Sequence, residues 1–197
     1  MSLSVSLYLV LVGLVAVERL VELAVARRNA VWSLARGGRE YGRGHYPAMV
    51  VLHTALLVAC AVEPWAAGRP FLPLLGWTAL ALALAAQGLR WWCVAALGPR
   101  WNTRVLVVPG LPLVTGGPYR FVRHPNYVAV VVEGAALPLV HSAWVTAACF
   151  TALNALLLRV RVRCEDAALA DAPADGAPAR DVPPHGTVAP APAGPAS

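Results

Sequence analysis

The sequence predicts an all-α, polytopic integral membrane protein with about five transmembrane helices, the last two forming a C-terminal helical hairpin. Hydrophobic residues make up 58% of the 197 residues, charged residues only 13%, and the mean hydropathy is +0.61. This composition is too apolar for a domain that must solvate its own surface. Several aliphatic runs also approach the roughly 20 residues that a helix needs to cross the hydrocarbon core. These runs are residues 3–17, 48–62, 71–89 and 127–160.

The first transmembrane helix is predicted to run from residue 3 to about residue 26. Glu18 and Glu22 lie one helical turn apart near its end, and Arg19 can pair with either. Carboxylates within a span are candidates for function, but near a span's end they also simply face water or an arginine, and the sequence leaves both interpretations open. Residues 27–45 are predicted to be an arginine-rich loop, because they are polar and contain four glycines.

Two further helices are predicted at residues 48–62 and 71–89. The first carries His53, for which a packing role is favoured over chemistry. The second can continue toward Leu97, where Gly98 and Pro99 stop it because proline cannot extend the helical hydrogen-bond ladder.

The aliphatic run 127–160 is longer than one crossing requires at about 1.5 Å per residue. Pro138 and the polar pair His141-Ser142 lie where a turn would fall, so two helices are predicted, at about 126–137 and 142–162. The first of them is short enough to be tilted or only partly embedded.

The composition changes at residue 170 to alanine, proline, aspartate and glycine, and residues 170–197 are therefore predicted to be disordered. The chain then divides into a three-span region (1–97), a polar connection with the hairpin (98–169) and this tail.

The basic residues indicate an orientation in the membrane rather than a nucleic-acid partner. The net charge is +6 and the isoelectric point about 9.7, but all sixteen basic residues are arginines and thirteen of them cluster in three segments. Under the positive-inside rule these segments face the cytoplasm. Residues 27–45, 98–124 and the C-terminus are then inside, and the N-terminus and residues 63–70 are outside.

The four cysteines do not form a recognisable metal site. They include neither a CxxC pair nor the close Cys/His spacing of a zinc site, so no metal is expected. Buried small hydrophobic side chains are the expected role. The cysteines are Cys60, Cys93, Cys149 and Cys164.

The connection before the hairpin concentrates polar side chains. Residues 110–127 contain two arginines, a histidine, two tyrosines and an asparagine, and Gly116-Gly117-Pro118 permits a tight turn whose backbone N–H groups are available to a ligand. Beyond the hairpin, Arg161 and Glu165 lie four residues apart on one helix face. Such a pair alone is more typical of a surface ion pair, but beside the polar connection it can line a pocket.

These residues resemble the isoprenylcysteine carboxyl methyltransferase family. The motif is Gly117-Pro118-Tyr119-Arg120-x-x-Arg123-His124-Pro125-Asn126-Tyr127, followed by two helices and Arg161-x-x-x-Glu165-Asp166. The resemblance covers about residues 100–169. In the N-terminal half, Glu18-Arg19 and Gly44-His45-Tyr46-Pro47 resemble a bacterial branch often associated with type III polyketide synthases.

The resemblance implies an S-adenosylmethionine-dependent O-methyltransferase of the bacterial inner membrane. It implies that Glu165 holds the ribose or amino-acid end of the cofactor and that Arg161, the catalytic residue, faces the methyl acceptor. His124 could instead act as a base toward a phenol, although cofactor binding is favoured. Arg104 departs from eukaryotic members, which carry an uncharged polar side chain at that cofactor contact. The residues implied to surround the cofactor are Leu111, Pro112, Leu113, Val114, Tyr119, His124, Pro125, Asn126 and Tyr127.

The expected acceptor is a lipophilic small molecule or a prenylated substrate, either an isoprenylcysteine-type carboxylate or the hydroxyl of a long-chain pyrone or resorcinol. Membrane lipid is a further expected partner, and nucleic acid is not. Two alternatives stay open: an NADPH-dependent reductase, because sterol reductases share a similar hairpin and an Arg-His-Pro-like segment, and a noncatalytic membrane protein.

Overall fold

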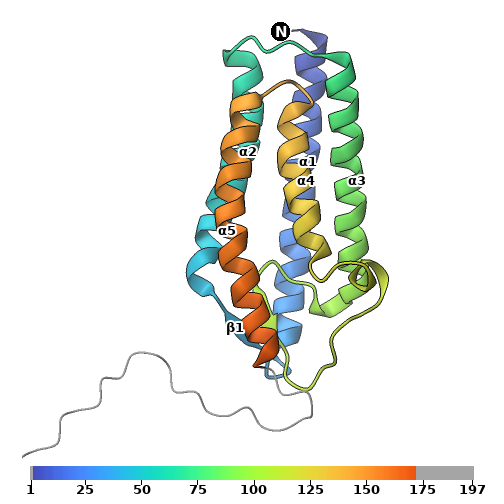
Figure 1. The fold of residues 1–197 in the computed structure, drawn as a ribbon, viewed down its shortest axis with the longest axis vertical. Helices are drawn as coiled ribbons and strands as arrows, with labels where there is room; N and C mark the ends of the chain where they lie inside the picture. Colours follow the sequence, from blue (N-terminus) through green and yellow to red (C-terminus); the bar gives the residue numbers. More distant parts are fainter. Residues whose placement is uncertain (1, 172–197) are drawn as a thin grey trace, which may run out of the picture.

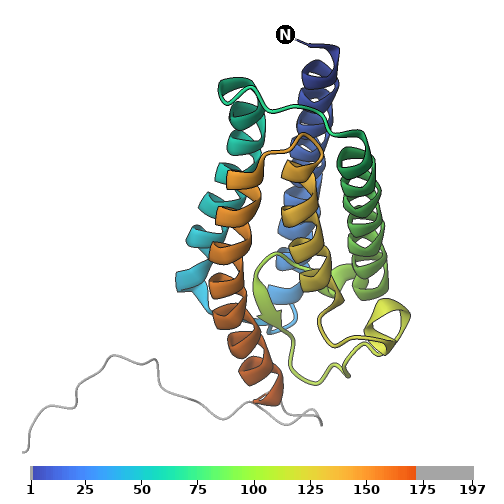
Figure 2. The same ribbon diagram turned by 45° about the horizontal axis from the view of Figure 1, so that its top comes forward.

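The structure, a computed structural model, describes residues 2–171 and consists mainly of five long helices packed side by side (Figure 1). The helices alternate in direction, and the α2–α3 and α4–α5 connections lie at the same end as the N-terminus (Figure 2). The polar segments between α1 and α2 and between α3 and α4 lie together at the other end. The helices are α1 (Leu3–Leu34), α2 (Tyr46–Ala66), α3 (Pro73–Leu97), α4 (Pro125–Leu139) and α5 (Trp144–Ala170).

The outer surface of the bundle is apolar, as expected for an all-α membrane protein, and this predicted fold class is confirmed. Large hydrophobic side chains such as Leu14, Leu74 and Leu153 point outward and are exposed, which is favourable in lipid and costly in water. Three segments are long and apolar enough to cross a membrane: Arg43–Ala66, Pro73–Arg100 and Trp144–Ala170. The number of crossings beyond these three stays a prediction.

The prediction for the end of α1 was wrong, because the helix continues eight residues beyond residue 26, to Leu34. This last part is held by tertiary contacts. Asn29 Nδ2 donates to the carbonyl oxygens of Trp101 (2.7 Å) and Gly98 (3.1 Å), and Asn102 Nδ2 donates to Ala26 O over 3.0 Å. The connection after α3 therefore packs against α1 and keeps its last turns helical.

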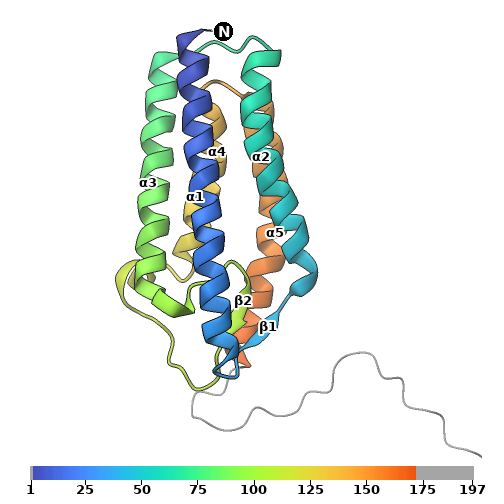
Figure 3. The ribbon, with the colours of Figure 1, turned by 180° about the vertical axis from the view of Figure 1, so that it is seen from behind.

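A two-stranded antiparallel sheet, absent from the prediction, joins the two polar segments (Figure 3). It pairs β1 (Arg39–Tyr41) with β2 (Val105–Val107), with Glu40 opposite Leu106. The sheet brings the segment after α1 against the segment that precedes the motif, so both halves of the chain contribute to this end of the bundle.

The helices pack through small side chains. α3 buries Ala79, Ala83 and Ala86 on one face, and alanines at this spacing let a neighbouring helix approach closely. On α4, Gly134 leaves room for the ring of Phe150 on α5, which a Cβ at this position would strike. Phe150 belongs to the buried apolar core, together with residues of every helix.

At the end of the bundle that carries the N-terminus, one carboxylate links α2 to the start of α5. Glu63, near the end of α2, accepts hydrogen bonds from Thr146 N (2.8 Å), Thr146 Oγ1 (2.7 Å) and Val145 N (3.2 Å). The first N–H groups of α5 have no partner within their own helix, and an acidic side chain satisfies them and complements the helix dipole.

The remaining boundaries differ modestly from the predictions. α2 begins two residues earlier and ends at Ala66, α3 does continue to Leu97, and α5 extends eight residues beyond residue 162. Cys60 and Cys93 are buried as expected, whereas Cys149 is exposed and Cys164 intermediate. Apart from Ala170 and Asp171, the predicted tail lies outside the described residues.

Candidate functional site

A polar cavity of about 90 Å³ opens at the end of the bundle that carries the sheet. Its walls come from β2 with the residues around it, from η3 (Gly117–Arg120), and from the facing ends of α4 and α5. Six of the residues singled out from the sequence lie in this wall, so the fold brings the motif and the end of the hairpin together. They are Tyr119, His124, Asn126, Tyr127, Arg161 and Glu165.

A second, larger cavity of about 160 Å³ lies inside the bundle. All five helices contribute to its lining, which is mainly apolar and includes Val50, Leu57, Val130 and Leu157. A cavity with such walls suits the hydrocarbon part of a lipophilic molecule.

Both cavities share one wall. Five residues line both of them: Trp101, Asn102, Asn126, Tyr127 and Arg161. These residues therefore lie between a group bound in one cavity and a group bound in the other.

The guanidinium of Arg161 is fixed in this wall. Its Nε donates to Tyr127 Oη over 2.8 Å, Nη2 donates to Thr103 O over 2.6 Å, and Nη1 lies 2.9 Å from Met49 Sδ. Arg161 is only 5% exposed, and it makes no ion pair with any residue in the range 2–171. A guanidinium has five N–H groups, so one on each terminal nitrogen stays available to an anionic oxygen.

Tyr127 connects Arg161 to Glu165. Its hydroxyl accepts from Arg161 and donates in a short hydrogen bond to Glu165 Oε2. The carboxylate of Glu165 lines the polar cavity only, whereas Arg161 reaches both. The phenol therefore links the guanidinium to a carboxylate that lies outside the lining of the larger cavity.

His124 is held at the start of α4 between two carboxylates. Its Nε2 lies 3.1 Å from Asp166 Oδ1 and its Nδ1 4.0 Å from Glu165 Oε2, and its ring stacks on that of Tyr127 with centroids 5.4 Å apart. Pro125 follows at the first helical position, where a missing N–H costs no hydrogen bond. His124 does not line the larger cavity.

Two polar atoms in the shared wall lack hydrogen-bond partners among the described residues. Trp101 Nε1, a donor, and Asn126 Oδ1, an acceptor, are both buried and unpaired. Buried polar atoms are rarely left unsatisfied, so a bound ligand is a natural partner for them. Together with Glu165 they fit a polar, cationic ligand such as S-adenosylmethionine.

Tyr119 offers a neutral phenol to the polar cavity. Burial raises the pKa of its hydroxyl, and the neighbouring Cys93 acts in the same direction. The phenol therefore stays protonated at neutral pH and can donate a hydrogen bond.

The structure does not bring the segment 111–114 to either cavity. Leu111, Pro112 and Leu113 are exposed and Val114 is intermediate. The segment is tied to the polar cavity only indirectly, because Arg100, which lines that cavity, donates to Pro112 O over 2.6 Å. A role for these four residues stays a prediction. Arg104, in contrast, does line the cavity, and its Nη1 lies 3.5 Å from Glu40 Oε2.

A buried charged cluster, absent from the sequence prediction as a unit, lies beside the larger cavity. Arg19 pairs with Glu18 (3.0 Å), Glu22 and Glu133 (2.8 Å), and Arg90 pairs with Glu22 (3.3 Å) and Glu133. Of these, Arg19, Glu22 and Arg90 line the cavity. The pairing of Arg19 with the glutamates of its own helix was predicted, but the partners on α3 and α4 were not.

Comparison with known proteins identifies relatives of this chain. The Isoprenylcysteine carboxyl methyltransferase (ICMT) family matches residues 79–171, which include the polar connection and the hairpin. An uncharacterized protein of Bacillus subtilis, YpbQ, is 38% identical over 164 residues, covering 83% of this chain and 96% of that protein. An uncharacterized protein of Haemophilus influenzae is 24% identical over 152 residues, covering 77% of this chain and 88% of that protein.

Proposed function

Because the chain belongs to the isoprenylcysteine carboxyl methyltransferase family, we propose that it transfers a methyl group from S-adenosylmethionine to an oxygen of a lipophilic acceptor. The donor would bind in the polar cavity and the acceptor in the larger one. The two would meet at the shared wall, beside Arg161 and Tyr127.

The observation that carries this proposal is the buried Arg161. A buried cation without an ion-pair partner is expensive unless an anion or strong hydrogen-bond acceptor reaches it. Its free N–H groups and its place in the wall of an apolar cavity suit the carboxylate or phenolate of an amphiphile. The charge-assisted hydrogen bonds would keep that oxygen in its anionic, nucleophilic form.

On the donor side, Glu165, Asn126, Trp101 and Tyr119 would hold the methyl donor. When bound, S-adenosylmethionine supplies a methyl group on a sulfonium, and its C–S bond breaks as the acceptor oxygen forms the new C–O bond. The protein's task is alignment rather than proton transfer, because an in-line displacement depends on the positions of the two reactants. Tyr127 contributes by fixing Arg161 and Glu165 relative to each other.

His124 would position the donor rather than remove a proton from the acceptor. It lines the polar cavity and not the acceptor cavity, and Asp166 already occupies its Nε2. A carboxylate acceptor needs no base, since it is ionised at neutral pH.

The acceptor would be an isoprenylcysteine-type carboxylate or the hydroxyl of a phenolic or pyrone lipid, delivered laterally through the membrane. The end that carries the polar cavity would face the cytoplasm of the inner membrane, where S-adenosylmethionine is available. Cysteine labelling of single substitutions at Arg36 and Trp65, which lie at opposite ends, tests this orientation with a membrane-impermeant reagent.

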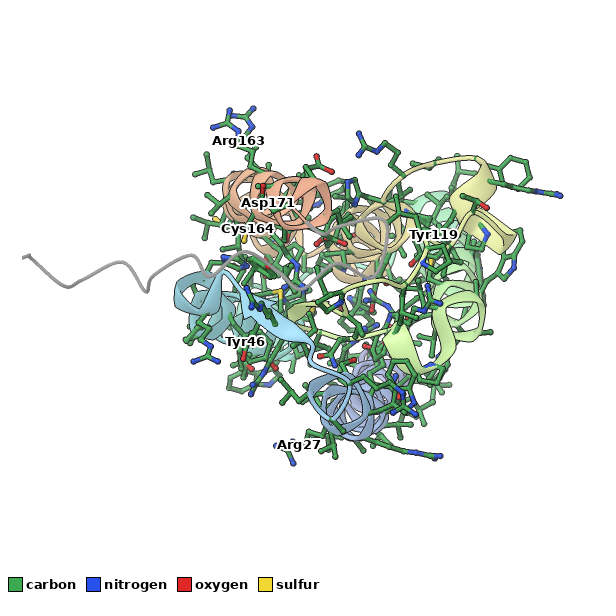
Figure 4. All side chains as sticks on the ribbon, turned by 90° about the horizontal axis from the view of Figure 1, so that it is seen from below. Arg27, Tyr46, Tyr119, Arg163, Cys164 and Asp171 are labelled. Carbon is green, nitrogen blue, oxygen red and sulfur yellow. The ribbon has the colours of Figure 1, made fainter. Side chains whose placement is uncertain are left out.

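Calorimetric titration of the detergent-purified full chain with S-adenosylmethionine, S-adenosylhomocysteine and NADPH tests the proposed donor. Saturable binding of both adenosyl ligands, weakened in His124→Ala, is expected. Arg163→Ala serves as control, because Arg163 points away from the bundle (Figure 4). Binding of NADPH alone, or of no nucleotide by a folded protein, would overturn the proposal.

A further inference from the structure

The larger cavity, which we propose holds the methyl acceptor, has a second polar region. This region lies deeper in the bundle than Arg161. Asn154 lies on α5, seven residues before Arg161 and on the same face. The separation along the helix axis is roughly 10 Å at 1.5 Å per residue. His53 lies on α2 one turn beyond Met49, the residue that contacts Arg161. Both side chains line the cavity.

Asn154 carries a polar atom without a hydrogen-bond partner in the described part of the chain. It is 2% exposed, and its Oδ1 is buried and makes no hydrogen bond among residues 2–171. Its neighbours in the cavity wall on the same helix, Leu157 and Leu158, are apolar. An unsatisfied amide in such surroundings is costly, which a ligand hydrogen bond would relieve.

His53 presents a hydrogen-bond acceptor at the same depth. Its Nδ1 lies 2.8 Å from Met49 O. A carbonyl oxygen only accepts, so Nδ1 carries the proton and Nε2 of the neutral ring is left as an acceptor. Phe150 packs edge-on against the ring, with centroids 5.3 Å apart, and holds its orientation.

The charged cluster beside these residues favours a ligand group that donates a hydrogen bond over one that accepts it. It contains three glutamates, Glu18, Glu22 and Glu133, and two arginines, Arg19 and Arg90. Arg90 Nε lies 3.3 Å from Glu22 Oε1 but is not aligned for a hydrogen bond, so this oxygen also lacks a donor. Glu22, His53 and Asn154 thus provide hydrogen-bond acceptor atoms on three helices that line the cavity.

We propose that His53, Asn154 and Glu22 recognise a hydroxyl on the acceptor's apolar body, about two helical turns from the oxygen that Arg161 holds. This inference rests on the proposed acceptor role of the cavity. It selects amphiphiles with a hydroxylated chain over purely hydrocarbon ones, because only the former can donate a hydrogen bond to one of these buried acceptor atoms.

The test measures binding without any methyl donor, so that it stays readable if methyl transfer is not found. The full chain in detergent is titrated with stearate, with stearate hydroxylated at its tenth carbon, and with stearate hydroxylated at its third carbon. The tenth-carbon acid should bind about tenfold more tightly than the other two, as expected for one hydrogen bond to otherwise unsatisfied groups. Equal binding of all three acids, or no binding of any, would overturn the proposal.

Two variants assign the preference to these residues. His53→Phe keeps the aromatic ring and Asn154→Leu keeps the volume, and the double variant should lose most of the preference for the tenth-carbon hydroxyl. Leu153→Met, an exposed position on the same helix and outside the cavity lining, should retain it. A preference that survives in the folded double variant would contradict the assignment.

Discussion

Arg161 Nε donates a hydrogen bond to Tyr127 Oη over 2.8 Å, and this bond joins the two helices of the C-terminal hairpin at the wall between the cavities. The same hydroxyl donates to Glu165. One phenol therefore links an arginine that lines both cavities to a carboxylate that lines only the polar cavity, so substitution of Tyr127 should affect ligand binding in both.

Tyr127→Phe is expected to lower methyl transfer and to weaken S-adenosylhomocysteine binding about tenfold, because Arg161 and Glu165 each lose a buried partner. The ring that stacks on His124 is kept. Transfer rates and calorimetric affinities check both effects. Tyr41→Phe, in β1, is the control, since the Tyr41 hydroxyl makes no hydrogen bond with the other described residues. Unchanged values in Tyr127→Phe would show that the Tyr127 hydroxyl has no functional role.

Arg161→Lys is expected to reduce kcat by about 100-fold, comparable to the removal of a preorganised donor, while S-adenosylhomocysteine affinity stays nearly constant. An ammonium keeps the charge but cannot contact Tyr127, Thr103 and an acceptor oxygen in the planar arrangement of a guanidinium. Arg163→Lys should behave like the parent chain. A kcat near that of the parent in Arg161→Lys would show that Arg161 does not position the methyl acceptor.

Glu133→Leu is expected to lower the free energy of unfolding by up to about 3 kcal/mol, because Arg90 and Arg19 each lose one buried counter-charge and then share Glu22. Denaturation in mixed detergent micelles measures this loss. Adding Arg90→Leu to Glu133→Leu should recover part of it. Arg43→Gln, in a surface pair with Glu40, should leave the stability nearly unchanged. A single Glu133→Leu variant as stable as the parent would mean that the cluster contributes little.

Gly134→Ala is expected to destabilise the bundle although alanine favours helices, because the new Cβ would strike the Phe150 ring. Gly13→Ala on α1, with no neighbouring atoms within 4 Å, should not destabilise. Combining Gly134→Ala with Phe150→Leu should restore stability, and thermal unfolding of the four proteins provides the comparison. Destabilisation that persists in the double variant would point to a cause other than this contact.

The helices were predictable because their apolar runs are long, but several of their ends were not. α1 continues past residue 26 because Asn29 and Asn102 form hydrogen bonds to distant backbone carbonyls, and such contacts leave no pattern in the local sequence. Three-residue strands such as β1 and β2 are likewise too short to show a period of two.

The site was predictable where its residues are close in sequence. Residues 119–127 and the Arg161–Glu165 pair form a motif, and the fold brings them together. Trp101, Met49 and His53 reach the same cavities from separate segments, and only the packing of the bundle identifies their partners. Asn154 did carry a usable indication, as a polar residue within an apolar span.

The wall shared by the two cavities also has a consequence for inhibitor design. A compound that tethers an adenosyl group to an alkyl chain would occupy both cavities through one linker passing Arg161 and Tyr127. The second group would then bind at the high effective concentration set by a short tether, and the combined affinity would exceed that of either fragment. Selectivity for this chain over soluble methyltransferases would come from the alkyl arm.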